Sequence, residues 1–150
     1  MTIEQRLAAD RDSMIRLLKG QTFVTGPFWL VNLLRFQPGG AQEYKKYAAA
    51  IEPAMRAVGA RPIFASYTCR TVVTSGGALL PVDGVFIGEY PSPSSLIEMN
   101  KRADYEAAHR FRAAALLGYR DVCGPSAMAR PKARRCASRS EPANSCAGEQ

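Results

Sequence analysis

Two side chains have the chemical types that proton transfer needs. His109 is the only histidine of the chain, and an imidazole titrates near neutral pH, which makes it a candidate general acid or base. Asn32 lies in the middle of the apolar run Phe28–Phe36, where its amide could hold a carbonyl or enolate oxygen as an oxyanion-type donor. Burying an unsatisfied amide costs about 1–3 kcal/mol, so a ligand, neighbouring backbone or a buried water must meet Asn32.

Four further residues are candidate substrate contacts. Tyr105 precedes His109 by four residues, so the two share one face of a helix, where a purely structural role for the histidine is the alternative. Arg110 could position an anionic substrate. Tyr67 and Glu89 lie on expected strands and could hydrogen-bond in the same pocket, although Glu89 could equally pair with an arginine and be structural.

Arg35 is also a candidate, as an anchor for a carboxylate. It follows Asn32 by three residues, an odd spacing, so a regular strand points the two side chains to opposite faces. Only a bulge or a strand end near Gln37 would bring both into one pocket. The alternative for Arg35 is an ion pair at a subunit interface.

Composition limits the partners and the location. The 150 residues suit one domain, contain no apolar run long enough to cross a membrane, and begin without a secretory signal, so we expect a cytoplasmic protein. The net charge of +7 divides into +4 over residues 1–124 and +3 over residues 125–150. Charges of both signs alternate along the body, which is typical of a solvated surface and makes nucleic acid an unlikely partner.

No cofactor or metal is expected. The four cysteines, at positions 69, 123, 136 and 146, form no Cys-x-x-Cys pair, and a single histidine cannot complete a zinc set. Free thiols are therefore predicted. A haem would need His109 as its axial ligand, and no other feature supports one. No phosphate-binding glycine pattern is present.

The periodicity of apolar residues predicts eight segments of secondary structure. In chain order they are a helix at 2–19, a strand at 28–36, a helix at 41–58, a β-rich stretch at 61–73, a strand at 82–90, a helix after Pro91, a helix at 105–117 and a short strand at 119–123. Pro53 should kink or break the second helix near Ile51. A hairpin-type loop is expected at 75–77. After the first helix the order is β-α-β-β-α-β, the ferredoxin-like α+β arrangement.

Capping residues mark where several helices should begin. Thr2 and Gln5 form a capping-box pair for the first helix. Either Ser92 or Ser95 could cap the helix after Pro91, and Asp104 the next one. The chain then divides into an N-terminal amphipathic helix with its linker (1–26), an α+β domain (27–124) and a basic tail (125–150) whose composition predicts disorder.

An ordered set of motifs carries a resemblance over about residues 28–124. These motifs are Val31–Phe36, Tyr44 with Tyr47, Gly59–Arg61, Glu89–Ser92, and Tyr105 with His109-Arg110. With them the chain resembles an uncharacterised small-domain family of the dimeric α+β-barrel superfamily. Gly59-Ala60 departs from the Gly-Gly pair common in similar chains, at a turn.

The resemblance implies a four-stranded antiparallel sheet with helices on one face, two such sheets packing face to face as a homodimer. The residues agree independently, because both faces of the strand at 28–36 are apolar and one layer of helices covers only one of them.

The superfamily includes cofactor-free monooxygenases, isomerases, lyases, cyclases and haem proteins, commonly with a pocket between sheet and helices, so the fold selects no reaction. We expect a small-molecule-binding homodimer, with cofactor-independent isomerase, lyase or cyclase chemistry on a small organic substrate, an anion being one option. The alternative is a non-catalytic ligand-binding or structural homodimer.

Overall fold

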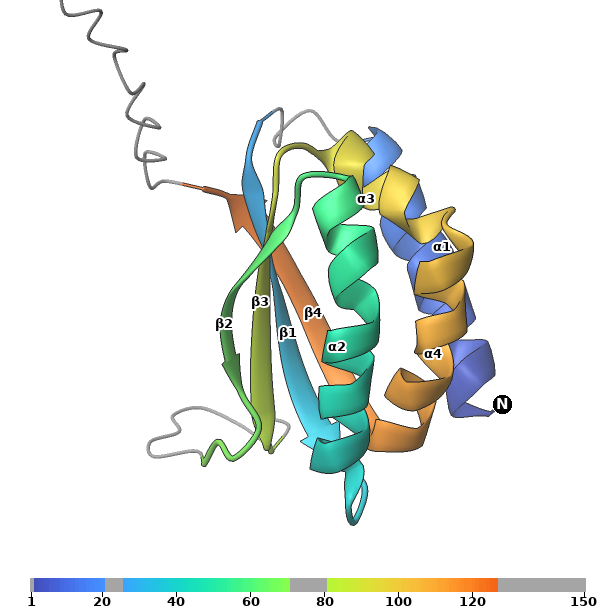
Figure 1. The fold of residues 1–150 in the computed structure, drawn as a ribbon, viewed down its shortest axis with the longest axis vertical. Helices are drawn as coiled ribbons and strands as arrows, with labels where there is room; N and C mark the ends of the chain where they lie inside the picture. Colours follow the sequence, from blue (N-terminus) through green and yellow to red (C-terminus); the bar gives the residue numbers. More distant parts are fainter. Residues whose placement is uncertain (1, 21–25, 71–80, 127–150) are drawn as a thin grey trace, which may run out of the picture.

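The sheet carries all its helices on one face (Figure 1). The computed structural model describes residues 2–20, 26–70 and 81–126. Over these residues the elements are α1 (Ile3–Gly20), β1 (Phe28–Phe36), α2 (Gly40–Ala57), β2 (Arg61–Ser66), β3 (Gly84–Tyr90), α3 (Pro93–Asn100), α4 (Ala103–Ala115) and β4 (Leu116–Pro125). The strands lie in the order β2-β3-β1-β4 and every pair is antiparallel, which confirms the predicted ferredoxin-like α+β fold.

Two of the predicted helix starts are confirmed. The side chain of Gln5 accepts from the Thr2 N–H at 2.9 Å, and Thr2 Oγ1 accepts from the Gln5 N–H at 3.2 Å, the reciprocal bonds of a capping box. At α3, Ser92 is the N-cap and its side chain accepts from the Ser95 N–H at 3.3 Å, with proline at the first helical position.

Two local predictions are wrong. Of the kink or break predicted at Pro53, the break is wrong, because α2 continues through Pro53 to Ala57. Pro53 is exposed, and so is Ala49, whose carbonyl loses its helical donor there, so water can replace the missing hydrogen bond. Asp104 does not cap α4, because Arg102 occupies the N-cap position and binds the Asp104 carboxylate at 2.9 and 3.0 Å.

Strand lengths also differ from the predictions. The final strand is longer than expected because it pairs with the whole of β1, from Phe28 to Phe36. β2 ends at Ser66, before the end of the β-rich stretch predicted at 61–73. The loop expected at 75–77 and most of the predicted tail lie outside the described residues, and the domain boundaries stay a prediction. Cys69 and Cys123 are free thiols, as predicted.

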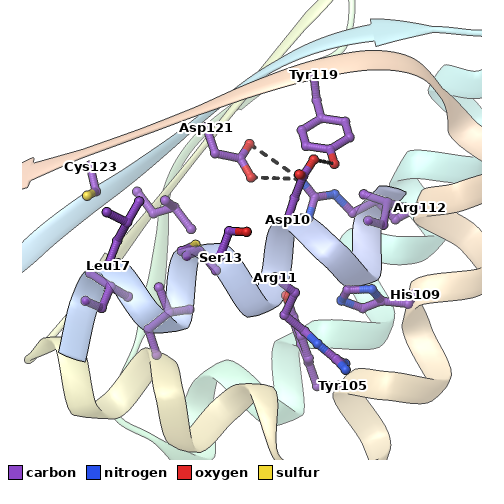
Figure 2. Close-up of a pocket in the computed structure, with 15 residues that line it drawn as sticks. Asp10, Arg11, Ser13, Leu17, Tyr105, His109, Arg112, Tyr119, Asp121 and Cys123 are labelled. Atoms are coloured by element: carbon purple, nitrogen blue, oxygen red, sulfur yellow. Dashed lines mark hydrogen bonds and ion pairs between the residues drawn. The ribbon is translucent and has the colours of Figure 1, made fainter. Parts of the chain in front are cut away.

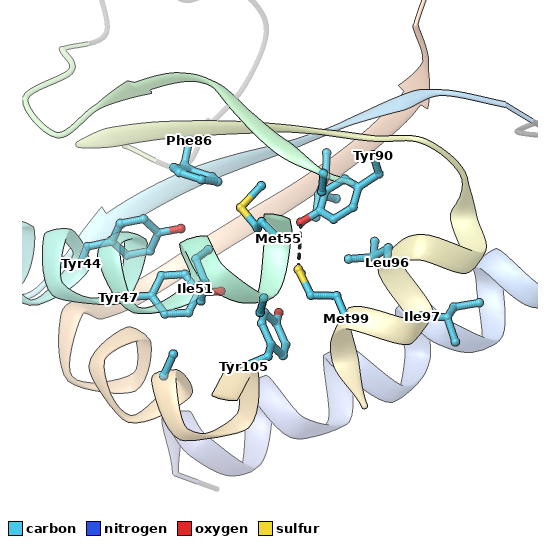
Figure 3. Packing of buried hydrophobic residues seen from close by; sticks show 14 of the residues in the cluster. Tyr44, Tyr47, Ile51, Met55, Phe86, Tyr90, Leu96, Ile97, Met99 and Tyr105 are labelled. Atoms are coloured by element: carbon cyan, nitrogen blue, oxygen red, sulfur yellow. Dashed lines mark hydrogen bonds between the residues drawn. The ribbon is translucent and has the colours of Figure 1, made fainter. Parts of the chain in front are cut away.

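The core lies between the sheet and the helices (Figure 3). Alternate side chains of β1, at positions 28, 30, 32 and 34, point to the helices and are buried. They meet tyrosines and apolar residues of α2, α3 and α4. The helix α2 begins against the end of α4, where a Cβ at Gly40 would lie 2.1 Å from the Ala115 carbonyl oxygen, so only glycine fits there.

The other face of the sheet, which we call the open face, is apolar and has no cover from any described element (Figure 1). Cross-strand pairing places its apolar residues beside one another: Trp29, Val31 and Leu33 of β1, Val85 and Ile87 of β3, Phe64 of β2 and Val122 of β4. Phe64 and Val122 are about half exposed, at 51% and 50%. Such a face is typical of a surface that another layer covers.

None of the helices described here combines the length and the apolar character that crossing a membrane requires.

Candidate functional site

A cavity of about 330 Å³ lies between α1, α4 and the helix face of β1 and β4 (Figure 2). Its size is at the lower end of the range for small-molecule sites. It is lined by Leu7, Asp10, Arg11, Ser13, Met14, Leu17, Leu18, Leu30, Leu96, Tyr105, His109, Arg112, Tyr119, Asp121 and Cys123. Nearly half of this wall comes from α1, the helix that the sequence placed outside the α+β domain.

A second cavity, of about 20 Å³, adjoins the first and has room for about one water molecule. The two cavities share Met14, Leu30, Tyr105, Arg112 and Asp121. Asn32 lines the small cavity, and His109 lines the large one. The structure therefore brings three predicted residues, Asn32, Tyr105 and His109, around one pair of cavities.

Asn32 is the polar residue of the β1 helix face. It is only 6% exposed, and its cross-strand neighbours are Phe86 on β3 and Asp121 on β4. Within the part of the chain that the structure describes, its amide has no hydrogen-bond partner. The amide thus keeps both of its donor hydrogens and its carbonyl oxygen for whatever occupies the small cavity.

An ion pair between Arg112 and Asp121 forms the shared wall of the two cavities (Figure 2). Nη2 of Arg112 lies 3.1 and 3.4 Å from the two Asp121 oxygens, and the guanidinium packs over the rings of Tyr47 and Tyr119. Burial opposes its charge, yet the Asp121 carboxylate keeps the Arg112 pKa well above its ordinary value. Its Nε is buried and has no partner, so one donor is unused.

His109 stands beside the ring of Tyr105 in an edge-to-face contact, with centroids 4.6 Å apart. Burial lowers the pKa of His109 to about 4, and the nearby charges of Arg112 and Arg11 act in the same direction. The imidazole is therefore neutral at neutral pH. The pKa of His109 is lower than the near-neutral value expected from the sequence. Its Nε2 is buried without a partner.

Tyrosines enclose the small cavity and its surroundings. Burial raises the pKa values of Tyr44, Tyr47 and Tyr105, so these phenols stay protonated at neutral pH. At the large cavity, Tyr119 donates its hydroxyl hydrogen to the Asp10 carboxylate, which joins β4 to α1 (Figure 2). The site is thus an apolar space with a few fixed polar groups at one end.

Two of the predicted contacts lie on the opposite side of the sheet. Arg35 is exposed, as its odd spacing from Asn32 indicated. Glu89 is buried on the open face, where one oxygen accepts from Trp29 Nε1 at 3.0 Å and the other from Arg61 Nε at 3.2 Å. Glu89 therefore has the structural pairing that was its alternative role.

Tyr67 and Arg110 also line neither of these two cavities. Tyr67 is half-buried beyond the end of β2, with Lys45 over its ring. Arg110 is exposed and packs on the Phe111 ring, with 4.7 Å from its guanidinium carbon to the ring centroid. Arg110 shares with His109 a different pocket, of about 240 Å³ between α1 and α4, which neither Asn32 nor Tyr105 lines.

Sequence reasoning missed the ion pair and the α1 wall. Arg112 follows His109 by three residues on an alanine-rich helix, a spacing that places both on one face. Tyr119, Asp121 and Cys123 alternate along the last strand, which indicated a shared face. No sequence signal connected α1 with either element. Among the described residues, no group of three or more His, Cys, Asp or Glu side chains is placed to hold a metal ion.

Comparisons with known proteins support the fold of this chain and give no information on its function. No protein-family model and no curated protein matches the chain. It is similar to the crystal structure of RPA0582, a protein of unknown function from Rhodopseudomonas palustris, with 23% identity and a TM-score of 0.59 over 81% of this chain and 94% of that one. The methylated form of the same protein gives the same identity and TM-score over 76% and 87%.

A weaker likeness links the chain to an uncharacterised NIPSNAP-like domain protein from Burkholderia xenovorans. The identity is 15% and the TM-score 0.45, over 71% of this chain and 91% of that one, too low to carry an argument. The comparisons therefore show a small α+β domain. Membership of the dimeric barrel superfamily stays a prediction.

Proposed function

We propose that the protein is a homodimer that binds a small organic molecule in the large cavity, with the polar end of the molecule toward Asn32. One observation carries the proposal: around two adjoining cavities, His109 Nε2 and Arg112 Nε are buried without a partner, and no described residue hydrogen-bonds the Asn32 amide. Leaving a buried polar group unsatisfied costs about 1–3 kcal/mol. A ligand that meets these groups recovers that free energy.

The open face supports the dimer. Its apolar residues belong to all four strands, and the helices are all on the other face. A second copy, related by a two-fold axis, offers the same apolar surface and would cover it. The Glu89, Trp29 and Arg61 contacts satisfy the buried carboxylate on that face without any group from a partner.

Cofactor-independent proton transfer, as in an isomerase, lyase or cyclase, is the chemistry that this site supports. Asn32 would donate to the substrate oxygen, and the neutral His109 would accept a proton at Nε2. A base with a pKa of about 4 is weak in the free protein. The negative charge that forms on the substrate oxygen would stabilise the imidazolium and raise that pKa.

The low pKa of His109 also favours a second candidate, a ligand-binding dimer without catalysis. In this alternative His109 serves only as a hydrogen-bond acceptor. The two candidates differ in one result: an enzyme converts its ligand, and alanine at His109 abolishes turnover while the dimer remains. A binding protein returns the ligand unchanged.

Native mass spectrometry of the purified full chain tests the proposal. We expect twice the chain mass and an additional small mass from a retained molecule. Asn32→Leu, which keeps the side-chain volume and removes the amide, should lose the additional mass and keep the dimer. Asn100→Ala is the control, because Asn100 is also a buried asparagine but lines neither cavity. A monomer, or a small mass that Asn32→Leu retains in full, contradicts the proposal.

A further inference from the structure

We propose that the ligand is an uncharged carbonyl compound with an apolar body of one or two rings, its carbonyl oxygen seated between Asn32 and Arg112. This inference rests on the proposed function and names the substrate class of that site. Three features of the cavities carry it: the balance of their charges, the kind of hydrogen-bonding groups left unused, and the apolar wall around the remaining volume.

The charges that line the large cavity balance. They are two positive groups, Arg11 and Arg112, and two negative groups, Asp10 and Asp121. Asp121 already neutralises Arg112 at 3.1 Å, and Arg11 is at the edge, 4.0 Å from Asp12. A carboxylate ligand would add a negative charge without a free counter-ion, which is unfavourable in a buried site. An uncharged ligand meets no such penalty.

Arg112 and Asn32, which line the small cavity, have three unused donor hydrogens between them, beside one acceptor, the Asn32 amide oxygen. Arg112 Nε carries one hydrogen that no described acceptor meets, and Asn32 carries two. Both side chains are more than nine-tenths buried, with exposures of 7% and 6%. The small cavity holds about one oxygen-sized atom. A carbonyl oxygen, which accepts two hydrogen bonds and carries no hydrogen, fits this pair of donors.

The large cavity sets the body of the ligand. Apolar side chains from α1, β1 and α3 surround it, including Leu18, Leu30 and Leu96. An apolar cavity of about 150 Å³ is enough to bind benzene. The 330 Å³ found here therefore accommodates one or two rings.

Isothermal titration calorimetry of the full chain with three probes tests this inference. The probes are 1-indanone, indane and indane-1-carboxylate, which share one ring system and differ in the oxygen group. We expect 1-indanone to bind about tenfold more tightly than indane, which corresponds to about 1.4 kcal/mol for the bonded carbonyl. Indane-1-carboxylate should bind more weakly than 1-indanone.

Asn32→Leu should reduce the preference for 1-indanone over indane to about twofold or less, because the Arg112 donor alone remains. Asn100→Ala should keep the tenfold preference. In case Asn32→Leu does not fold, 1-indanone labelled with ¹³C at the carbonyl gives a second readout on the wild type. Its carbonyl resonance should move downfield on binding, as a hydrogen-bonded carbonyl does.

The outcomes separate the two proposals. If none of the three probes binds, the proposed function itself fails for molecules of this size. If indane or the carboxylate binds as tightly as 1-indanone, or Asn32→Leu keeps the full preference, the cavity takes small molecules but the carbonyl assignment is wrong. An unmoved carbonyl resonance in the bound state overturns it as well.

Discussion

Two buried polar side chains on neighbouring central strands face opposite ways and differ in how they are satisfied. Glu89 of β3 lies on the open face, and both of its oxygens accept hydrogen bonds, from Trp29 and Arg61. Asn32 of β1 lies on the helix face and has no partner among the described residues. A buried group that its own chain satisfies is part of the structure, whereas one left unsatisfied beside a cavity can be met by a ligand or a water in that cavity.

The helix face and the open face of the sheet differ in what remains uncovered or unpaired. The helix face is covered by its own chain, yet two cavities remain there, and His109 Nε2 and Arg112 Nε beside them are buried without a partner. The open face has its carboxylate satisfied but exposes an apolar surface. For the helix face we therefore propose a small ligand with a polar end, which would fill the cavities. For the open face we propose a second copy of the chain, which would cover the apolar surface.

The largest effect should come from Arg112→Met, which leaves the Asp121 charge without its partner. We expect a loss of about 3 kcal/mol in the free energy of unfolding, near the low end for a broken buried pair because Asp121 is 22% exposed. The matched change on the open face is Arg61→Met, where the arginine side chain is 58% exposed and the Glu89 side chain 4%. The loss should be smaller there, because Trp29 Nε1 still donates to the Glu89 carboxylate. Urea unfolding at one fixed protein concentration measures both.

The double variant Arg112→Met, Asp121→Leu is the control for this prediction. Because it removes both charges and keeps an apolar volume, it should regain most of the lost stability. Equal losses for Arg112→Met and Arg61→Met would show that the two faces do not differ in this respect.

Val122→Asp should break the proposed dimer while the fold of each subunit remains. Val122 is half exposed in the single chain and lies opposite Val31 on the open face. Placing a carboxylate there in an apolar interface should weaken the dimer on the order of 100-fold. Sedimentation velocity measures the change, with Ala49→Asp on the exposed side of α2 as control. An unchanged dimer would mean that the open face is not the interface.

The faces of β1 could be predicted from the sequence, because alternation along a strand depends only on position. It separated Asn32 from Arg35, as the structure shows. The order of elements likewise determined the sheet topology. Residue spacing thus predicts those features of the fold that depend on regular local geometry.

The rest depends on how elements meet. The pair between Arg112 and Asp121 joins α4 to β4 through a direct helix-to-strand transition at Leu116, which periodicity placed at the wrong residue. The α1 wall depends on the packing of a helix that no motif connects to the sheet. The lowered pKa of His109 is a consequence of burial and of two arginines, and no feature of its immediate sequence indicates it.

The pH dependence of stability should report His109. Its folded-state pKa of about 4 is below its ordinary value of 6.5, so the unfolded chain binds the proton more tightly between these values. The contribution to stability is complete above about pH 6.5 and is lost as the pH falls toward about 4. Wild type should therefore lose more stability than His109→Gln between about pH 7 and pH 5 in urea unfolding. Equal losses would mean that burial does not depress this pKa.

The smallest effect should come from Tyr119→Phe, which tests whether α1 is a fixed wall of the helix face. The change removes only the hydrogen bond from the Tyr119 hydroxyl to Asp10 and keeps the ring over Arg112. We expect a loss of about 1 kcal/mol or less in global stability, because the bond is exposed. Hydrogen exchange of the α1 amides should quicken severalfold while that of the β1 amides stays the same. If the exchange rate of the α1 amides is unchanged, the apolar contacts of α1 alone fix this helix against the sheet. The hydrogen bond from Tyr119 to Asp10 would then not contribute to closing the helix face.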